Sequence, residues 1–268
     1  MRALKTLLTI AIVLAALGGG AAVAVRASRG KVEGPTALKS DFVVAQNAMS
    51  IGLYAARVAP GPHVIVFDAG LDPLGRPIDA LLSALGASRD DVTDVFLTHG
   101  HPDHIAGVAV LPKARVHLGA ADVPLAAGQM QPDALMPMVF GKLVGNPPVT
   151  ANTPLTGAAT FPVGGADASK VVKAFPVPGH TPGSFVYLYD GVLVVGDIMQ
   201  LKQGRLDTTM RLADPHPEQN KASIISLKQQ LANETVDIVC TAHGKDTGCT
   251  PKGLGKTLLD DLIQRLGG

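Results

Sequence analysis

The stretch "DVFLTHGHPDHIAGV", residues 94–108, gathers coordinating side chains at one turn. Three histidines and an aspartate follow an apolar run within six positions: His99, His101, Asp103 and His104. His99 and His101 are two residues apart, so an extended segment points both side chains the same way. Pro102 suits the first turn of a helix that begins there. Because imidazole suits zinc and iron and carboxylate adds a hard oxygen, the turn predicts a metal site for one ion or two.

Three further candidate ligands stand at the ends of predicted strands. His180 lies in "VPGHTPGS" between two strands, Asp197 ends the apolar strand "GVLVVGD", and His243 follows the last strand in "VCTAHGK". Taken singly, each is better read as a packed loop histidine or a turn cap. Since the ends of successive strands converge along one edge of a packed sheet pair, their joint occurrence favours a shared metal site. The remaining candidates His63, His117 and His216 are read as structural or surface residues.

Strand and helix signals alternate along both halves of the chain. Apolar runs predict strands at 41–46, 50–59, 63–70, 94–99, 114–120, 169–180, 183–190, 191–197 and 236–244. Helical spacing appears at 77–86, 216–234 and 253–267. The last helix is expected to bury a stripe of leucines: Leu254, Leu258, Leu262 and Leu266. This order predicts two sheets packed together with helices outside them.

The segment 122–160 is rich in proline, methionine and glycine and has no clear period. It is too apolar for a disordered linker and too interrupted for a long helix. Two interpretations stay open: a lid or wall of a binding pocket, and plain packing against the core.

Bulk composition argues against nucleic acid as a partner. The chain has 268 residues, a net charge of +1 and 4% aromatic residues, with no basic surface to suggest nucleic acid. Few rings are present to stack on bases. A small-molecule substrate is therefore expected, and the sequence gives no indication of oligomeric state.

The N-terminus has the order of a secretory signal. Arg2 and Lys5 precede an uncharged stretch from Thr6 to Val25, and Ala22-Val23-Ala24 fits a small-x-small cleavage pattern. An uncleaved membrane anchor is the competing interpretation, because the apolar stretch is close to the ~20 residues that span a bilayer. We expect residues 1–27 to be a signal peptide or anchor, 28–40 a linker and 41–268 one domain, located in the periplasm or secreted. Membrane contact is expected only through that anchor.

Export changes the interpretation of the two cysteines, Cys240 and Cys249. In an oxidising compartment they can pair and staple the loop that contains His243. Two separate thiols are the alternative, because sequence does not give the distance between their Cα atoms.

The motifs together resemble the metallo-β-lactamase-fold hydrolase superfamily. The resemblance is carried by the H-x-H-x-D-H cluster, the histidine of "GHTPGS", the aspartate of "GD" and the late "HG" histidine, in that order. "FDAG" at 67–70 also resembles the superfamily's early strand and turn, and the likeness extends from about residue 41 onward. It implies an α+β fold, a four-layer αββα sandwich of two mixed sheets flanked by helices.

The resemblance also implies a division of ligands between two ions, most simply two Zn²⁺ per chain, with Fe or Mn as alternatives. One ion would be held by His99, His101 and His180, and the other by Asp103, His104 and His243. Asp197 would bridge them, since two cations about 3.5–4 Å apart need a bridging anion. The resemblance implies a metal-bridging hydroxide as nucleophile, and Asp103 could orient it and later relay a proton to the leaving group.

The predicted activity is hydrolysis of an ester, thioester, lactone or amide. True β-lactamases commonly lack an aspartate at the bridging position, so Asp197 favours the glyoxalase II-like, lactonase and phosphodiesterase branches. Only about one helix follows His243, which argues against the glutathione thioester activity of glyoxalase II itself. The alternatives are a β-lactamase-type amide hydrolase, an iron-dependent persulfide dioxygenase-like oxidoreductase on the same fold, and a non-catalytic exported binding protein.

Overall fold

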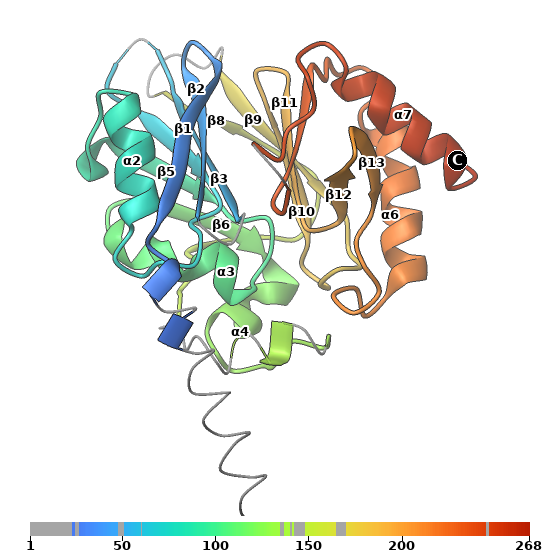
Figure 1. Cartoon of the computed structure of the whole chain (residues 1–268), viewed down its shortest axis with the longest axis horizontal. Helices are drawn as coiled ribbons and strands as arrows, with labels where there is room; N and C mark the ends of the chain where they lie inside the picture. Colours follow the sequence, from blue (N-terminus) through green and yellow to red (C-terminus); the bar gives the residue numbers. More distant parts are fainter. Residues whose placement is uncertain are drawn as a thin grey trace, which may run out of the picture.

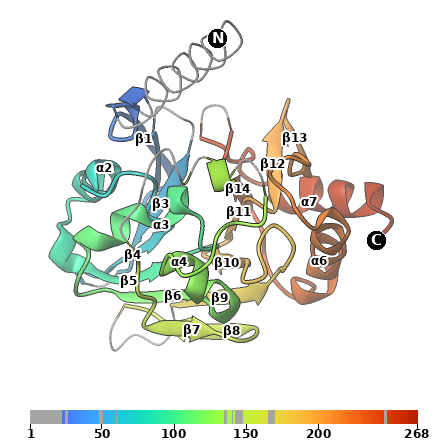
Figure 2. The same ribbon diagram turned by 90° about the horizontal axis from the view of Figure 1, so that it is seen from below.

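Two β-sheets lie face to face between helices in the computed structural model (Figure 1). Both views place α2 (Arg76–Ala84) outside one sheet and α6 (Pro217–Gln230) with α7 (Gly255–Arg265) outside the other (Figure 2). The structure describes residues 23–24, 27–47, 51–59, 61–134, 137–139, 141, 148–164, 170–244 and 247–268.

The first sheet has its seven described strands in chain order: β1 (Val32–Lys39), β2 (Phe42–Asn47), β3 (Gly52–Arg57), β4 (Val64–Phe67), β5 (Val92–Phe96), β6 (Arg115–Gly119) and β7 (Thr153–Leu155). Strands β1 to β4 pair antiparallel, and β4 to β7 pair parallel. The parallel half needs crossovers, and α2 supplies the one between β4 and β5.

The second sheet runs in the order β14–β11–β10–β9–β8 within the described residues. Its strands are β8 (Ala159–Pro162), β9 (Val171–Pro176), β10 (Phe185–Tyr189), β11 (Val192–Gly196) and β14 (Ile238–Thr241). Only β11 and β14 pair parallel. A separate hairpin, β12 (Met199–Lys202) with β13 (Arg205–Thr208), follows β11. Both sheets contain parallel and antiparallel pairs, so both are mixed.

Short helices fill the connections between strands of the first sheet. They are α3 (Pro102–Ile105), α4 (Val123–Ala126) and the 3-10 turns η1 (Arg89–Asp91), η2 (Ala106–Val110) and η3 (Ala120–Asp122). Pro102 starts α3 as the sequence predicts, and its fixed φ suits a first helical position.

Three apolar clusters separate the four layers. The first joins α2 to one face of the first sheet, and it includes Leu81 of α2 and Val66 of β4. The second lies between the sheets, where the rings of Phe96 and Tyr187 are 5.3 Å apart. The third packs α6 and α7 on the outer face of the second sheet, around Leu227. The αββα sandwich is therefore confirmed.

Strand β10 shows why the central strands lack an alternating pattern. Phe185, Tyr187 and Tyr189 belong to the cluster between the sheets, whereas Val186 and Leu188 belong to the cluster under the helices. Both faces of the strand are covered, so every position is apolar.

The linker predicted over residues 28–40 is wrong for its second part. Val32–Lys39 forms β1, which pairs with β2 at the edge of the first sheet. Most of its side chains are exposed, because an edge strand has a neighbour on one side only. Polar residues with Gly34 and Pro35 therefore suit it, and the sequence alone does not distinguish such a strand from a linker.

The predicted leucine stripe on α7 is also wrong in part. Leu259, Leu262 and Ile263 are the buried apolar residues of the helix, while Leu254 precedes it and is 45% exposed. A four-residue step turns an α-helix by about 400°, so a strict four-residue series drifts about 40° per step around the axis. Such a series leaves the buried face after two or three members.

The leader at residues 1–27 lies outside the described residues except for 23–24 and 27. Among the helices that the structure describes, none has the length and apolarity needed to cross a membrane.

Candidate metal centre

Seven predicted ligands meet where strands of both sheets end. His99 and His101 follow β5, and Asp103 and His104 stand in α3 at its continuation. His180, Asp197 and His243 follow β9, β11 and β14 respectively. These three strands run in the same direction, because β10 is antiparallel to both β9 and β11, and β14 is parallel to β11. Their carboxyl ends therefore share one edge.

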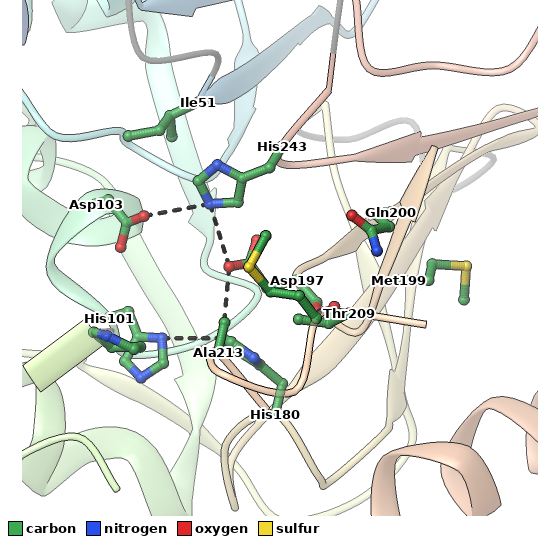
Figure 3. Close-up of a pocket in the computed structure, with 12 residues that line it drawn as sticks. Ile51, His101, Asp103, His180, Asp197, Met199, Gln200, Thr209, Ala213 and His243 are labelled. Atoms are coloured by element: carbon green, nitrogen blue, oxygen red, sulfur yellow. Dashed lines mark hydrogen bonds and ion pairs between the residues drawn. The ribbon is translucent and has the colours of Figure 1, made fainter. Parts of the chain in front are cut away.

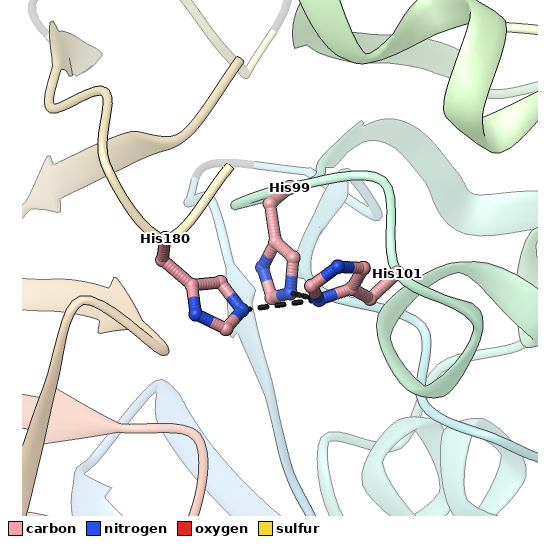
Figure 4. Close-up of side chains that lie close together, drawn as sticks. All are labelled: His99, His101 and His180. Carbon is pink, nitrogen blue, oxygen red and sulfur yellow. Dashed lines mark hydrogen bonds between the residues drawn. The ribbon is translucent and has the colours of Figure 1, made fainter. Parts of the chain in front are cut away.

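Three histidines form a compact, buried group. The Nε2 atom of His99 lies 2.9 Å from Nδ1 of His101, and Nε2 of His180 lies 3.0 Å from the same atom (Figure 4). Burial lowers the pKa of all three, and neighbouring imidazoles add to the effect for His99 and His101. For His101, burial and His180 bring the pKa to about 3. Three neutral rings thus direct nitrogen atoms at one point.

A second group combines a carboxylate with two histidines. The Oδ2 atom of Asp103 lies 3.8 Å from Nε2 of His104 and 3.4 Å from Nε2 of His243. His104 is fully buried, whereas the His243 side chain is 44% exposed. Burial lowers the pKa of His104, but Asp68 and Asp197 outweigh it and hold the value well above the ordinary one.

Asp197 lies between the two groups (Figure 3). Its Oδ1 atom is 3.5 Å from Nε2 of His104, and its Oδ2 atom is 3.6 Å from Nε2 of His180 and 3.3 Å from Nε2 of His243. Burial raises the pKa of Asp197, but His243 and His104 outweigh it, so the carboxyl stays ionised. One carboxylate therefore faces both clusters.

Asp68 fixes the orientation of two histidine rings. Its buried carboxylate accepts hydrogen bonds from the backbone N–H and the hydroxyl of Thr98, at 2.8 and 2.9 Å. It also accepts one from Nδ1 of His104 at 2.8 Å. Because the Thr98 hydroxyl donates to Asp68, its oxygen accepts from Nδ1 of His99, 3.1 Å away. The Nε2 atoms of His99 and His104 are then the ring nitrogens that face the site.

Asp122 joins the two loops that carry the three-histidine group. Its carboxylate accepts hydrogen bonds from the backbone N–H groups of Gly100 and Gly183, each at 2.8 Å, and from the Thr181 hydroxyl at 2.7 Å. Gly100 separates His99 from His101, and Thr181 follows His180. A Cβ at Gly183 would stand 2.6 Å from the backbone nitrogen of Asp122, so the close approach requires glycine.

Gly196 places Asp197 at the end of β11. Its φ is +57°, a left-handed conformation that glycine adopts without strain. A Cβ there would stand 2.5 Å from Oγ1 of Thr98. The strand end can thus lie against the turn that carries His99.

The residues present fit divalent metal ions. Within the described residues, Nε2 of His104 and Oδ1 of Asp197 are buried and have no hydrogen-bond partner. Imidazole nitrogens and carboxylate oxygens converge here, and zinc, iron and manganese accept both as ligands. Three sets place their ligand atoms within 4.8 Å of one another: His99, His101 and His180; His99, His104 and Asp197; Asp103, His104 and His243.

A disulfide closes the loop that carries His243. Cys240 in β14 and Cys249 are bonded, which decides between the two interpretations of the sequence. Ile51 pairs with His243 as an isolated β-bridge, so the loop is also held from the first sheet. The carbonyl of Thr241 accepts a hydrogen bond from the Tyr54 hydroxyl at 2.8 Å.

The three other histidines lie away from the candidate centre. His117 is buried and its Nε2 lies 2.7 Å from Asp94, which also pairs with Arg115. His63 is half-buried, and His216 is exposed and 3.7 Å from Asp133. Their interpretation as structural or surface residues agrees with these positions.

A cavity of about 280 Å³ opens over the candidate centre. Five of the seven predicted ligands line it: His101, Asp103, His180, Asp197 and His243. Ligand atoms thus face a space that can admit a small molecule.

Fold and ligand clusters together define a metal-binding αββα protein of the hydrolase type. The sequence model of the metallo-β-lactamase superfamily matches residues 56–243, which is more than half of the chain. The chain therefore belongs to the metallo-β-lactamase superfamily, whose members include metal-dependent hydrolases.

Two curated proteins show the sequence similarity. The chain is 29% identical to the uncharacterized protein YobT of Bacillus subtilis (strain 168) over 195 residues, which covers 68% of this chain and 79% of YobT. It is 31% identical to a hydroxyacylglutathione hydrolase of Anaeromyxobacter dehalogenans over 134 residues, or 49% of this chain and 42% of that protein.

Solved structures share the fold. A metallo-β-lactamase from Cronobacter sakazakii superposes with a TM-score of 0.64 at 20% identity, covering 91% of this chain and 95% of its own. The Rm3 metallo-β-lactamase superposes with a TM-score of 0.60 at 21% identity, covering 91% of this chain and 98% of its own. At these identities the likeness establishes the architecture alone.

Proposed function

We propose that this protein is an exported, dinuclear metal-dependent hydrolase that cleaves an ester, thioester, lactone or amide bond. The observation that carries the proposal is the place of Asp197, whose carboxylate lies within 3.6 Å of nitrogen atoms from both ligand groups. A single anion shared by two groups of neutral and acidic ligands suits a pair of cations. Two Zn²⁺ per chain are the simplest occupants, and Fe or Mn suits the same ligands.

His99, His101 and His180 would hold one ion, and Asp103, His104 and His243 the other. Divalent ions at such a site lower the pKa of coordinated water to about 7 and polarise a carbonyl oxygen. The chain's own contribution is to fix the ligands, through Asp68 and Asp122, before substrate enters.

Asp103 is the proposed proton carrier. Burial raises its pKa, but His104 and His243 outweigh it and lower the value to about 2, so the carboxylate is ionised at neutral pH. It also lines the cavity. Oδ2 of Asp103 can accept a proton from the attacking water and pass it to the leaving group, as general acid–base catalysis requires.

The similarity to a hydroxyacylglutathione hydrolase supports the inclusion of thioesters among the substrates, although the matched region spans less than half of that protein. Export is proposed from the signal-like order of residues 1–27.

The test is hydrolysis by zinc-loaded protein of a panel containing a model ester, a thioester, a lactone and a β-lactam. We expect cleavage that a chelator abolishes and added zinc restores. Asp197→Asn, which keeps the shape of the side chain, should lower kcat/KM at least about 100-fold, since it alters a direct ligand. The matched control is Asp207→Asn, an exposed aspartate in the neighbouring β13.

Full activity in metal-free protein would contradict the proposal. Iron in the natively purified protein, with oxygen uptake on addition of a persulfide, would instead support the dioxygenase alternative.

A further inference from the structure

The cavity over the candidate centre has two unlike walls. Besides the ligands, apolar side chains from four separate segments line the cavity: Ile51, Pro137, Met199, Met210 and Ala213. The remaining lining residues, Gln200 and Thr209, are polar but uncharged. Figure 3 shows Met199, Gln200 and Thr209 on the side of Asp197 away from Asp103. A molecule with its carbonyl at the ligands would therefore rest its remainder on apolar surface.

The apolar wall is a defined part of the fold. Met199 begins β12 and is 1% exposed, packed in the cluster under the helices. The Thr209 hydroxyl donates a hydrogen bond to the backbone carbonyl of Asp197. The Ala213 N–H donates to the carbonyl of Met210 at 2.9 Å, which closes a turn. The wall is thus tied to the residue that faces both ligand groups.

Charge is absent from this wall. Among the described residues that line the cavity, none is a lysine or arginine. The Gln200 amide already donates to the carbonyl of Thr208 at 2.8 Å. Arg211 is exposed and is not a lining residue. Against these described residues, a carboxylate carried by the substrate away from its reacting bond would lose its hydration without gaining a partner, which is costly.

The volume of the cavity and the flexible methionine side chains that line it restrict the substrate further. The volume of about 280 Å³ is near the lower end of the roughly 300–1,000 Å³ typical of small-molecule sites. Methionine side chains adapt to partners of varied shape, and Met199 and Met210 both contribute. A short flexible chain fits these conditions better than a large or highly charged conjugate.

We propose that the site takes small, uncharged aliphatic esters, thioesters or lactones, with the alkyl part against Met199, Met210 and Ala213 and the carbonyl at the ligands. This inference rests on the proposed hydrolase function and names its substrate class.

The first experiment measures kcat/KM for p-nitrophenyl esters from acetate to octanoate. We expect a rise of two- to fourfold per added methylene until the cavity is full, about fourfold being the ratio for one fully buried CH₂. For esters of equal length, a terminal carboxylate should lower kcat/KM at least tenfold. A flat series, or preference for the carboxylated ester, would overturn the proposal.

The variant Met210→Gln tests the wall itself. Met210 is 52% exposed, so the change is compatible with folding, and glutamine nearly preserves its length. The increase in kcat/KM per added methylene should be smaller in this variant than in the wild type. Leu212→Gln is the matched control, because Leu212 is 62% exposed and does not line the cavity. An equal effect of both variants on the increment would contradict a role for the wall.

A binding experiment separates this inference from the proposed function. Straight-chain methyl ketones share the carbonyl and alkyl chain but have no leaving group, and calorimetry can follow their binding to zinc-loaded protein. Affinity that rises with chain length, and that Met210→Gln weakens, supports the apolar site. It does so even if no ester is hydrolysed, because inert esters count against the proposed hydrolase function and not against the apolar site. Affinity independent of chain length would overturn the inference while leaving hydrolysis untouched.

Discussion

The substitution Asp122→Asn tests whether the candidate centre depends on the junction between its two loops. In the wild type, Oδ1 of Asp122 accepts a hydrogen bond from the backbone N–H of Gly183. Its Oδ2 accepts from the backbone N–H of Gly100 and from the Thr181 hydroxyl. An asparagine can keep one oxygen in place, so at least one buried backbone N–H faces an NH₂ group instead of an acceptor. An unsatisfied buried donor costs about 1–3 kcal/mol. The free energy of unfolding should fall by that amount.

The same change should weaken metal binding at the three-histidine group. Residues that orient ligands typically alter metal affinity by about 10–100-fold, and Asp122 holds the loops of His101 and His180. Guanidinium unfolding of metal-free protein measures stability, and titration against a chromophoric chelator measures affinity. Asp90→Asn is the control, since Asp90 is 76% exposed and forms a surface ion pair with Lys113. If Asp122→Asn matched this control in both measurements, the junction would have no such role.

Three further predictions concern stability. Replacing Cys240 by serine opens the disulfide to Cys249 and should lower the free energy of unfolding by about 2–3 kcal/mol, as denaturant melts of oxidised protein would show, because the closed loop is short. Burial raises the pKa of Asp94, but hydrogen bonds from its histidine and arginine partners outweigh it and hold the value below 3.8. The ionised Asp94 therefore stabilises the folded protein at pH values above the pKa that this carboxyl has in the unfolded chain. The stabilisation is lost as the pH falls through its lower pKa in the folded protein. Asp94→Asn should destabilise at pH 7, and the difference from wild type should shrink below about pH 4; a constant difference would contradict this. Gly196→Ala should cost about 1–3 kcal/mol, because it strains a left-handed residue and approaches Thr98; an unchanged melting temperature would refute the packing described.

The sequence predicts that the seven candidate ligands meet at one edge because they follow the ends of apolar strands. His99, His180, Asp197 and His243 each come after a different strand, and His101, Asp103 and His104 stand in the turn and short helix that follow His99. Strands that run in the same direction place their carboxyl ends at the same edge of a sheet. This expectation can be stated from the sequence alone. Their roles as metal ligands remain predictions.

Residues that hold the ligands are harder to predict. Asp68 lies in the "FDAG" stretch, but nothing local shows that it contacts His104, 36 positions away. Asp122 carries no motif, and its partners Gly100 and Gly183 are backbone donors, which leave no signal in residue type. Such contacts depend on how the two sheets are packed.

The two interpretations of residues 122–160, a pocket wall and plain packing against the core, both stay open. Residues 122–160 look apolar and irregular, yet Pro137 is their one contribution among the described lining residues. Met199 and Met210 provide more, and they lie in a hairpin region whose sequence resembles ordinary surface strands. The hairpin faces the cavity because it starts directly after Asp197, and that geometry is not visible in hydrophobic periodicity.

The central claim is that two metal ions share Asp197, and anomalous diffraction at the zinc edge from crystals of the zinc-loaded protein tests it most directly. We predict two peaks, one within about 2.0–2.2 Å of ligand atoms of His99, His101 and His180 and one similarly close to Asp103, His104 and His243, with Asp197 in contact with both. A single peak under saturating zinc, or two peaks that Asp197 does not join, would contradict the account.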